Sequence, residues 1–243
     1  MSISPSTVFH FTSKKGLEGI LSDNFKLKYC VEKLNHSTRP VEVAIPMVSF
    51  CDIKISEITE HIEKYGHYGI GLSKEWAVEK GLNPVVYLNS SSKFAADLID
   101  NMREVSWDMD IPREERVNKT NIIRYSKVYE GPLFRKGKTI EKYRFADERE
   151  WRYVPPFNED FFAWHNLNQY DTPAKKRSCN SKLKNERLYF NANQILYIIV
   201  KKESEIDNII AHIRHVKGKN YTMHEIDRLT TRILSYERIL NDF

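Results

Sequence analysis

The stretch Tyr65–Tyr87 reads YGHYGIGLSKEWAVEKGLNPVVY, and it decides the fold class. The apolar run Tyr68–Leu72 predicts a strand, and Ser73 is placed to cap a short helix that follows it. Gly81 suits the end of that helix, after which Pro84–Leu88 returns as a strand. These alternating short elements indicate an α+β fold, with small mixed or antiparallel sheets and flanking helices.

Three glycines stand close together at the start of this stretch: Gly66, Gly69 and Gly71. Their order does not match the glycine fingerprint of dinucleotide-binding folds, which excludes a Rossmann fold. Because glycine has no Cβ, such a backbone can approach a ligand closely. The rings of Tyr65 and Tyr68 add flat faces on which a heterocycle can stack. A ligand pocket and a plain glycine-rich turn into a strand both stay open as interpretations.

Further strands are expected on both sides of this stretch. Val8–Thr12 predicts a strand followed by a short helix, and Glu42–Cys51 predicts a strand whose Pro46 suits an edge or a bulge. Lys142–Val154 should include a strand, and the nearly continuous apolar run Ile195–Val200 is typical of a buried central strand. The remaining segments have weaker patterns, with helix and loop expected at 108–137 and irregular chain at 157–187.

The C-terminal tail has a helical pattern. Thr222 and Glu225 form a capping-box pair. Five apolar residues follow at alternating steps of three and four, as in a heptad repeat: Ile226, Leu229, Ile233, Tyr236 and Leu240. We therefore expect one domain at residues 1–202 and a helical segment at residues 203–243. That segment packs either on its own domain or on a partner protein.

Two acidic side chains in the segment Glu-Arg-Glu-Trp-Arg are candidates for catalysis. Glu148 and Glu150 are two residues apart, so on a strand both side chains face the same side. Paired carboxylates shift each other's pKa, and one carboxylate can stabilise an oxocarbenium-like transition state when a glycosidic bond breaks. Arg149 and Arg152 lie alongside, so a strand held by salt bridges is the alternative interpretation.

The cysteines and histidines give no spacing typical of a metal site, and we predict no bound metal. Cys30, Cys51 and Cys179 are widely spaced, which favours a reducing compartment, and we expect a cytoplasmic protein. His10 lies in a Phe-His-Phe-Thr stretch, where an imidazole is either a core residue or a ligand contact. We recognise no secretory signal and no apolar run long enough to cross a membrane.

The formal net charge of +5 is concentrated in one segment. Residues 175–187 contain six basic side chains and one acidic side chain, the basic ones being Lys175, Lys176, Arg177, Lys182, Lys184 and Arg187. Such a segment can bind nucleic acid or an acidic partner, and it can equally be a solvated loop.

Three of these motifs together resemble ADP-ribosyltransferase-type folds. In those folds a histidine on the first strand precedes a short helix, as His10 does in the line Phe9–Thr12. The segment Tyr68–Ala77, followed by Pro84–Tyr87, resembles the middle part of the same fold. Glu148 and Glu150 then fall in the region where that family carries a glutamate on a later strand.

That resemblance implies a pocket for NAD without a metal. His10 would contact the adenosine ribose, with Thr12 in support. Tyr68 would stack on the nicotinamide, and Tyr65 is the substitute candidate for this platform. Three small residues would line or cap the same site: Gly69, Gly71 and Ser73.

The resemblance also implies roles for the two glutamates in a transfer reaction. Glu150 would bond a hydroxyl of the nicotinamide ribose and stabilise the oxocarbenium ion as the glycosidic bond breaks. Glu148 would orient the acceptor. The protein would then act through positioning and charge stabilisation.

A second resemblance is more specific. Pro46–Ile53 and Tyr65–Trp76 are similar to the most recognisable stretch of the AbiGi family of bacterial abortive-infection proteins. AbiGi is known as one half of a two-gene phage-resistance system, labelled the antitoxin of a nucleotidyltransferase-like toxin. This implies a cognate toxin as partner, or the operator DNA. An NAD-dependent effector enzyme and a non-enzymatic antitoxin are therefore both open hypotheses.

Overall fold

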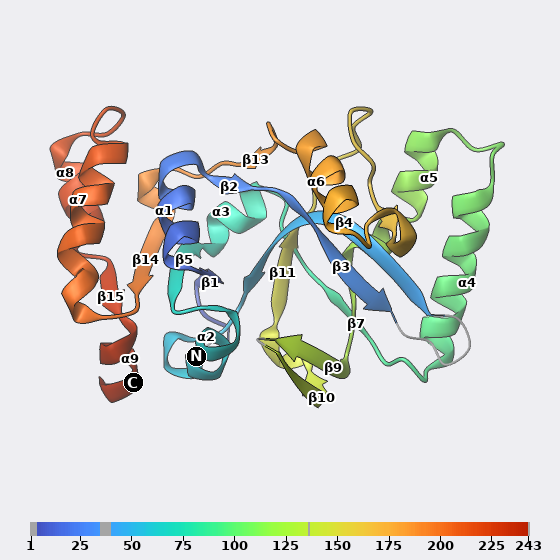
Figure 1. The fold of residues 1–243 in the computed structure, drawn as a ribbon, viewed down its shortest axis with the longest axis horizontal. Helices are drawn as coiled ribbons and strands as arrows, with labels where there is room; N and C mark the ends of the chain where they lie inside the picture. The colour runs from blue at the N-terminus through green and yellow to red at the C-terminus, as the bar shows by residue number, and fades with distance from the viewer. Residues whose placement is uncertain (1–3, 35–39, 136, 243) are drawn as a thin grey trace. The chain divides into compact units, whose positions relative to one another are not determined.

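The computed structural model describes residues 4–34, 40–135 and 137–242 of the chain (Figure 1). The chain forms two compact units, each assembled from separate segments. Unit one comprises residues 1–26, 49–82 and 187–243, and unit two comprises residues 27–48 and 83–186. Each unit mixes helices with short strands, so the predicted α+β class is confirmed.

The main sheet of unit one has the strand order β15–β14–β5–β1, with the end of β4 beside β1. Its strands are β1 (Thr7–Thr12), β5 (Tyr68–Ser73), β14 (Ile195–Val200) and β15 (Ile233–Ser235), and β2 (Phe25–Lys26) pairs separately with β13 (Arg187–Leu188). β15 runs parallel to β14, whereas the other neighbours are antiparallel. The predicted strand Ile195–Val200 therefore lies between two others, and most of its side chains are buried.

The helices of unit one are α1 (Lys14–Asp23), α2 (Thr59–Tyr65), α3 (Lys74–Glu79), α7 (Ile206–Lys217), α8 (Met223–Thr230) and α9 (Tyr236–Asp242). Single 3₁₀ turns lie at Ile55–Glu57, Ala192–Gln194 and Glu203–Glu205. Ser73 caps α3 as predicted, because its hydroxyl accepts a hydrogen bond from the backbone N–H of Trp76 at 3.2 Å. One hydrophobic cluster of this unit packs Phe9 and Phe11 of β1 against residues of α2, β14 and α9.

The C-terminal tail differs from the expected continuous helical pattern. The capping box of Thr222 and Glu225 starts α8 as predicted, but α8 ends at Thr230. Residues of the heptad-like series then continue as the strand β15 and the helix α9. A parallel ladder to β14, with Ile198 opposite Ile233, outweighs the helical pattern because it buries β-branched side chains in the sheet. The segment 203–243 belongs to unit one.

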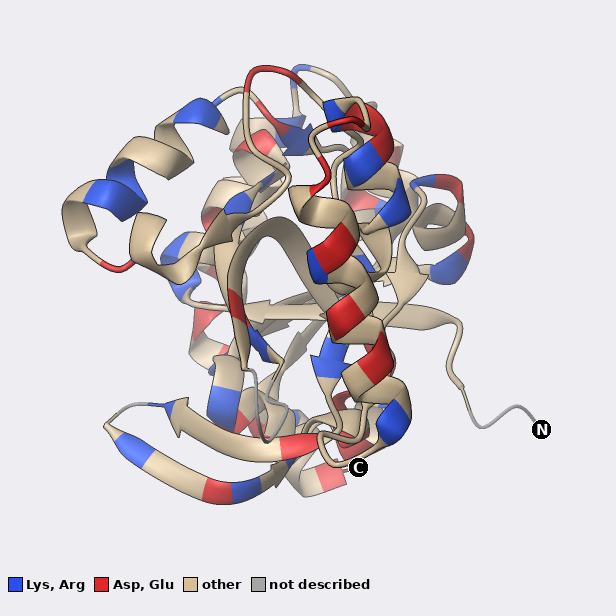
Figure 2. Ribbon diagram, turned by 90° about the vertical axis from the view of Figure 1, so that its right-hand side faces the viewer, with Lys and Arg blue, Asp and Glu red and all other residues tan. Residues whose placement is uncertain are grey.

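The strands of unit two are β3 (Lys28–Leu34), the first part of β4 (Val41–Cys51), β6 (Asn83–Pro84), β7 (Val86–Leu88), β8 (Ser126–Val128), β9 (Glu130–Arg135), β10 (Lys138–Arg144), β11 (Glu150–Tyr153) and β12 (His165–Asn166). Its helices are α4 (Lys93–Trp107), α5 (Arg113–Lys119) and α6 (Pro173–Lys182), with 3₁₀ turns at Asn121–Tyr125, Phe145–Glu148 and Leu167–Gln169. β3 pairs with β4, β7 runs parallel to β8, and β9 and β10 form a hairpin. Lysine, arginine and acidic residues all occur along that hairpin (Figure 2).

Pro46 lies inside β4 opposite Tyr29, where the β3–β4 register continues without the bulge that the sequence allowed. The backbone N–H of Tyr29 donates to Asn180, and its carbonyl accepts from the hydroxyl of Tyr170. Tyr29 therefore directs its backbone polar groups away from β4, and this position of the ladder requires no N–H from Pro46.

One sequence expectation in unit two is confirmed and one is corrected. The segment Lys142–Val154 includes a strand as predicted, namely β11, which is separated from β10 by a 3₁₀ turn and by Arg149 in the left-handed conformation, with φ at 45°. The segment 157–187, expected to be irregular, contains α6. Thr172 caps that helix and Pro173 occupies its first turn, which is a standard start signal.

No helix in the described part of the chain is both long and apolar enough to cross a membrane.

Candidate functional site

The two predicted catalytic glutamates lie close together in unit two. Glu150 opens β11, whereas Glu148 is the last residue of the preceding 3₁₀ turn and does not share the strand. Both are nevertheless aimed at the same cation, because Lys127 of β8 lies 2.9 Å from Glu148 Oε2 and 2.7 Å from Glu150 Oε2. The expected convergence of the two carboxylates therefore occurs, through a bend in the chain rather than through strand alternation.

Arg152 extends this contact into a chain of alternating charges. Its Nε lies 2.8 Å from Glu150 Oε1, and its Nη2 lies 2.8 Å from Oε1 of Glu32 on β3. We call these five side chains the charge cluster: Glu32, Lys127, Glu148, Glu150 and Arg152. Arg152 also donates through Nη1 to the backbone carbonyl of Arg124.

The charge cluster is buried. Arg152 is fully buried and the side chains of Glu148 and Glu150 are each 5% exposed, while Lys127 and Glu32 retain only slightly more exposure. With all groups ionised, three carboxylates face two cations, so the cluster carries one excess negative charge. Removing charges from water is costly, and it is offset only where each charge keeps well-placed partners.

Burial and neighbouring charges shift the pKa values of these groups in opposite directions. Burial acts to raise the pKa of Glu150, but Arg152 and Lys127 outweigh it and hold that pKa well below its usual range. For Glu32 burial wins, and its pKa is raised although Arg152 and Lys127 oppose the shift. Burial acts to lower the pKa of Arg152, yet Glu150 and Glu32 raise it overall. Glu32 therefore accepts a proton more readily than an ordinary glutamate does.

Tyr87 of β7 completes the surroundings of Glu150. The backbone N–H of Glu150 donates to the Tyr87 hydroxyl at 2.8 Å, and burial raises the pKa of that phenol. An ammonium and a guanidinium therefore flank the ionised carboxylate of Glu150, while the Tyr87 hydroxyl holds the backbone of the same residue. Such a carboxylate is held firmly in place, and it can act on a ligand only by exchanging one of these partners for it.

His10 is placed differently, in the aromatic core of unit one. Its Nδ1 lies 2.8 Å from the backbone carbonyl of Ser49, and its ring packs on Phe25 and Phe50 with centroids 5.3 and 5.7 Å away. Burial lowers its pKa, so the imidazole is neutral at pH 7. These contacts are those of a satisfied core histidine, and its role toward NAD stays a prediction.

The glycines of β5 have a packing role. β1 pairs with β5 so that Phe9 lies opposite Gly71 and Phe11 opposite Gly69. A Cβ on Gly71 would lie 2.7 Å from the Phe9 ring, and one on Gly69 would lie 2.8 Å from the Phe11 ring. The two rings stack on each other with centroids 5.8 Å apart. The glycine pattern therefore makes room for a pair of phenylalanine rings.

The tyrosines and Thr12 also have structural contacts within unit one. Thr12 lies opposite Tyr68 in the β1–β5 ladder. The Tyr68 hydroxyl donates to Glu205 at 2.9 Å, and burial together with Glu205 raises its pKa to about 12. Tyr65 stacks on His61, with ring centroids 4.4 Å apart. Their proposed stacking on nicotinamide stays a prediction.

The basic segment is helical and its charges are partly compensated. Lys175 lies 2.9 Å from Asp171, Lys176 lies over the Tyr170 ring, and none of the residues of α6 is buried. The side chain of Asn180 attaches the helix, since it accepts from Tyr29 and donates to the Tyr170 hydroxyl. Nucleic-acid binding through this segment stays a prediction.

Sequence reasoning missed three residues of the charge cluster or its surroundings: Glu32, Lys127 and Tyr87. They lie on β3, β8 and β7, far from Glu150 along the chain, and only the tertiary fold brings them to it. Arg152, which the sequence suggested as a partner of the glutamates, does pair with Glu150, whereas Arg149 is exposed. A lone polar residue in a short strand carries no local signal of such a role.

The fold and the charge cluster describe an α+β protein of two units with a buried ionic network. The family described as "Putative abortive phage resistance protein AbiGi, antitoxin" matches residues 23–201. An abortive phage resistance protein AbiGi of Lactococcus lactis subsp. cremoris is 30% identical over 234 residues, covering 87% of this chain and 94% of that relative. The chain belongs to the AbiGi family, which confirms that part of the resemblance. No solved structure matches it.

Proposed function

We propose that this chain is an abortive-infection phage-resistance protein that acts as a non-enzymatic antitoxin by binding a cognate toxin protein. The observation that carries the proposal is the family match, because the matched family is described as an antitoxin and the match extends into both units. The relative in Lactococcus lactis is also named as a phage-resistance protein.

The geometry of the charge cluster supports a role without catalysis. Glu150 uses both carboxylate oxygens on Arg152 and Lys127, and Glu148 binds the same lysine. A transition state would have to compete with these buried ion pairs for the carboxylate. The cluster is better suited to fixing β8, β11 and β3 relative to one another within unit two.

Toxin neutralisation tests the proposal directly. The wild-type chain, co-expressed with the toxin of the same two-gene system, should restore bacterial growth. Glu150→Gln keeps the shape of the side chain but removes the carboxylate that catalysis would use. A Glu150→Gln variant that melts as a folded protein should still restore growth, and its failure to do so would contradict a non-enzymatic role.

The surface that meets the toxin can be sought in the tail with point variants. Deleting residues 203–243 would remove β15 and much of the core of unit one, since Ile226, Leu229 and Tyr236 are buried. Leu240 is half exposed and can be changed without that loss. Leu240→Asp, compared with wild type, reports whether α9 contacts the toxin.

An ADP-ribosyltransferase-like enzyme that binds NAD is the second candidate. It is favoured by the order of the three motifs and by the convergence of Glu148 and Glu150 on Lys127. Isothermal titration of NAD into wild type, His10→Ala and Glu150→Ala tests it. Binding by wild type that both variants lose would support the enzyme, whereas no heat with wild type would exclude it. Either function would operate in the cytoplasm, where the free thiols of Cys30, Cys51 and Cys179 persist.

A further inference from the structure

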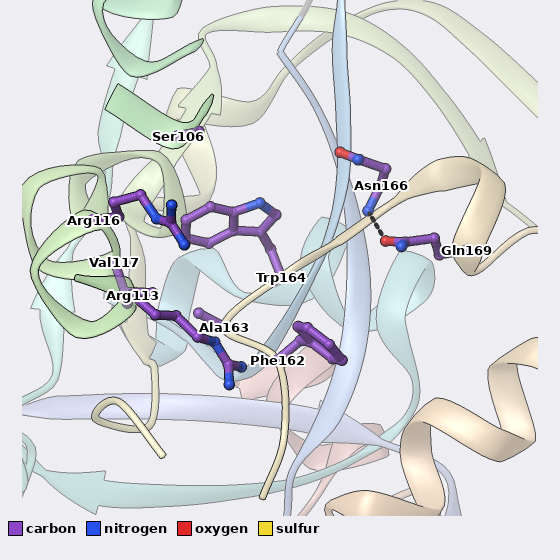
Figure 3. Close-up of a pocket in the computed structure, with 9 residues that line it drawn as sticks. All are labelled: Ser106, Arg113, Arg116, Val117, Phe162, Ala163, Trp164, Asn166 and Gln169. Atoms are coloured by element: carbon purple, nitrogen blue, oxygen red, sulfur yellow. Dashed lines mark hydrogen bonds between the residues drawn. The ribbon is translucent and has the colours of Figure 1, made fainter. Parts of the chain in front are cut away.

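Unit two contains a cavity of about 200 Å³ that is separate from the charge cluster. Its walls come from the end of α4, from α5, and from the segment that runs from Phe162 into β12 (Figure 3). Arg113 and Arg116 extend from α5 toward that segment, where Phe162 and Trp164 stand (Figure 3). Two guanidinium groups and two aromatic rings thus share one small hollow.

Neither arginine forms an ion pair with the residues that the structure describes. Arg113 donates one hydrogen bond, from Nη2 to the backbone carbonyl of Phe161 at 3.3 Å. Arg116 donates through Nη1 to the carbonyl of Asp108 and to the sulfur of Met109. A guanidinium has five N–H donors in a planar fork that matches a carboxylate or a phosphate. Both arginines therefore keep donors for an anion.

Hydrogen bonds to backbone carbonyls hold both guanidinium groups in place, and aromatic rings add to this for Arg113. Arg113 lies over the rings of Phe157 and Phe162, at 5.4 and 4.9 Å from their centroids. Glu115 of the same helix is exposed and pairs with Lys119 at 2.9 Å. The local positive charge is thus positioned before any ligand arrives, which lowers the entropic cost of binding.

The aromatic residues indicate what accompanies the anion. Trp164 packs by one side against the apolar cluster of Val43, Ile45 and Met47, and it remains partly exposed at the cavity. Phe162 is 58% exposed, and the Arg113 guanidinium lies over its ring at 4.9 Å from the centroid. Flat faces beside cationic donors suit a heterocyclic base that stacks while its phosphate meets the arginines.

The volume limits the size of the ligand. Pockets that enclose drug-sized molecules measure roughly 300–1,000 Å³, so a cavity of about 200 Å³ is too small for a dinucleotide such as NAD. It suits one base and one phosphate, with the sugar toward the opening. Ser106 and Gln169 line the same cavity and offer polar contacts for a base edge.

We propose that this cavity binds a single nucleotide unit, with its phosphate on Arg113 and Arg116 and its base beside Trp164 and Phe162. The unit is either a free nucleoside monophosphate or the 5′-phosphorylated end of a single strand, since both present the same chemistry. This site is distinct from the NAD pocket of the second candidate function, whose cofactor residues lie in unit one. It depends on neither of the functions proposed above.

Titration calorimetry with AMP, adenosine, inorganic phosphate and a 5′-phosphorylated oligo(dA) of eight nucleotides tests the site. AMP should bind at least tenfold more tightly than adenosine or phosphate alone, because only AMP offers both groups. Tighter binding of the oligonucleotide than of AMP would identify the strand end as the source, and the reverse would identify the free nucleotide. No binding of AMP or oligonucleotide to wild type at millimolar concentration would overturn the proposal.

Matched variants locate the binding. Arg113→Gln and Arg116→Gln should each weaken AMP binding about tenfold or more, and Trp164→Ala should do the same while Trp164→Phe stays within about threefold of wild type. Arg144→Gln, which removes an exposed arginine of β10, is the control and should leave binding unchanged. Equal losses in Arg144→Gln and Arg113→Gln would overturn the site. If an arginine variant fails to fold, iodide quenching of tryptophan fluorescence decides the outcome: AMP should protect wild type from quenching and should not protect Trp164→Phe, and equal protection of both would overturn the site.

Discussion

β5 of unit one and β11 of unit two both have an unusual composition, glycine-rich in β5 and charged in β11, and the two compositions have opposite physical causes. In β5 the glycines have no side chains, and this leaves room for the rings of Phe9 and Phe11. In β11 charged side chains are buried, and charged partners on other strands offset the free-energy cost of burying them. An unusual glycine pattern can thus be explained by packing alone. Buried charges have a desolvation cost that apolar packing does not offset, so they require charged or hydrogen-bonding partners.

The variant with the largest expected loss of stability removes Arg152, the cation that joins two carboxylates of the charge cluster. Arg152→Met should lower the free energy of unfolding by about 3–5 kcal/mol, because it leaves Glu150 and Glu32 buried without their shared guanidinium. Urea unfolding followed by circular dichroism measures the loss. Arg149→Met is the control, since Arg149 is exposed, and it should change stability by no more than about 0.5 kcal/mol. Similar losses in both variants would contradict the cluster's role.

The same contrast explains how far the sequence alone could predict the fold. Ser73 and Thr222 were recognisable as helix caps, and Ile195–Val200 as a buried strand, because each signal lies within a few adjacent residues. The break after Thr230 was missed, since Ile233 joins β14 through a contact that lies more than thirty residues away in the chain. Local patterns predict local structure, and long-range pairing can override them.

The site was partly predictable for the same reason. Glu148 and Glu150 were identified as a pair from their spacing, and they do converge, although Glu148 is outside the strand. Lys127 could not be found, because nothing in Ser-Lys-Val marks it as the cation between them. Arg113 and Arg116 fell in a segment with a weak pattern, and only the fold places them beside Trp164.

A smaller loss of stability is expected when a side chain is added at a glycine of β5. Gly71→Ala should lower the free energy of unfolding by about 1–3 kcal/mol, because the new Cβ would lie 2.7 Å from the Phe9 ring and 2.9 Å from a methyl group of Thr7. Gly19→Ala, in α1, is the matched control. Nothing lies within 4 Å of its Cβ position, so it should raise stability by roughly 0.5–1 kcal/mol. Chemical denaturation of both variants measures the difference.

A double variant identifies the cause of that loss. Phe9→Leu together with Gly71→Ala should lose less stability than the two single changes added together, because the smaller side chain frees space for the new methyl group. Strict additivity would show that the Phe9 ring is not what excludes a Cβ at Gly71. Such a result would reopen the interpretation that these glycines admit a ligand.

The smallest expected effect is on the pH dependence of stability, in which Glu32 and Glu150, the two carboxylates that Arg152 joins, contribute in opposite directions. The folded-state pKa of Glu32 is raised, so above the usual glutamate value of about 4.3 the folded protein holds a proton more readily than the unfolded chain. Stability from this group therefore decreases as pH rises through that window. The pKa of Glu150 is lowered, so its contribution is present above the usual value and is lost as pH falls below it.

Glu32→Gln should remove only the first of these dependences. It keeps an acceptor for Arg152 and cancels the excess negative charge of the cluster, so at pH 7 its free energy of unfolding should lie within about 1 kcal/mol of wild type. As pH is lowered from 7 toward 4.5, wild type should gain stability relative to the variant. Below that range both should lose stability together, because Glu150 is common to them. Urea unfolding at a series of pH values measures the difference, and one that is constant across the series would show that folding does not raise the pKa of Glu32.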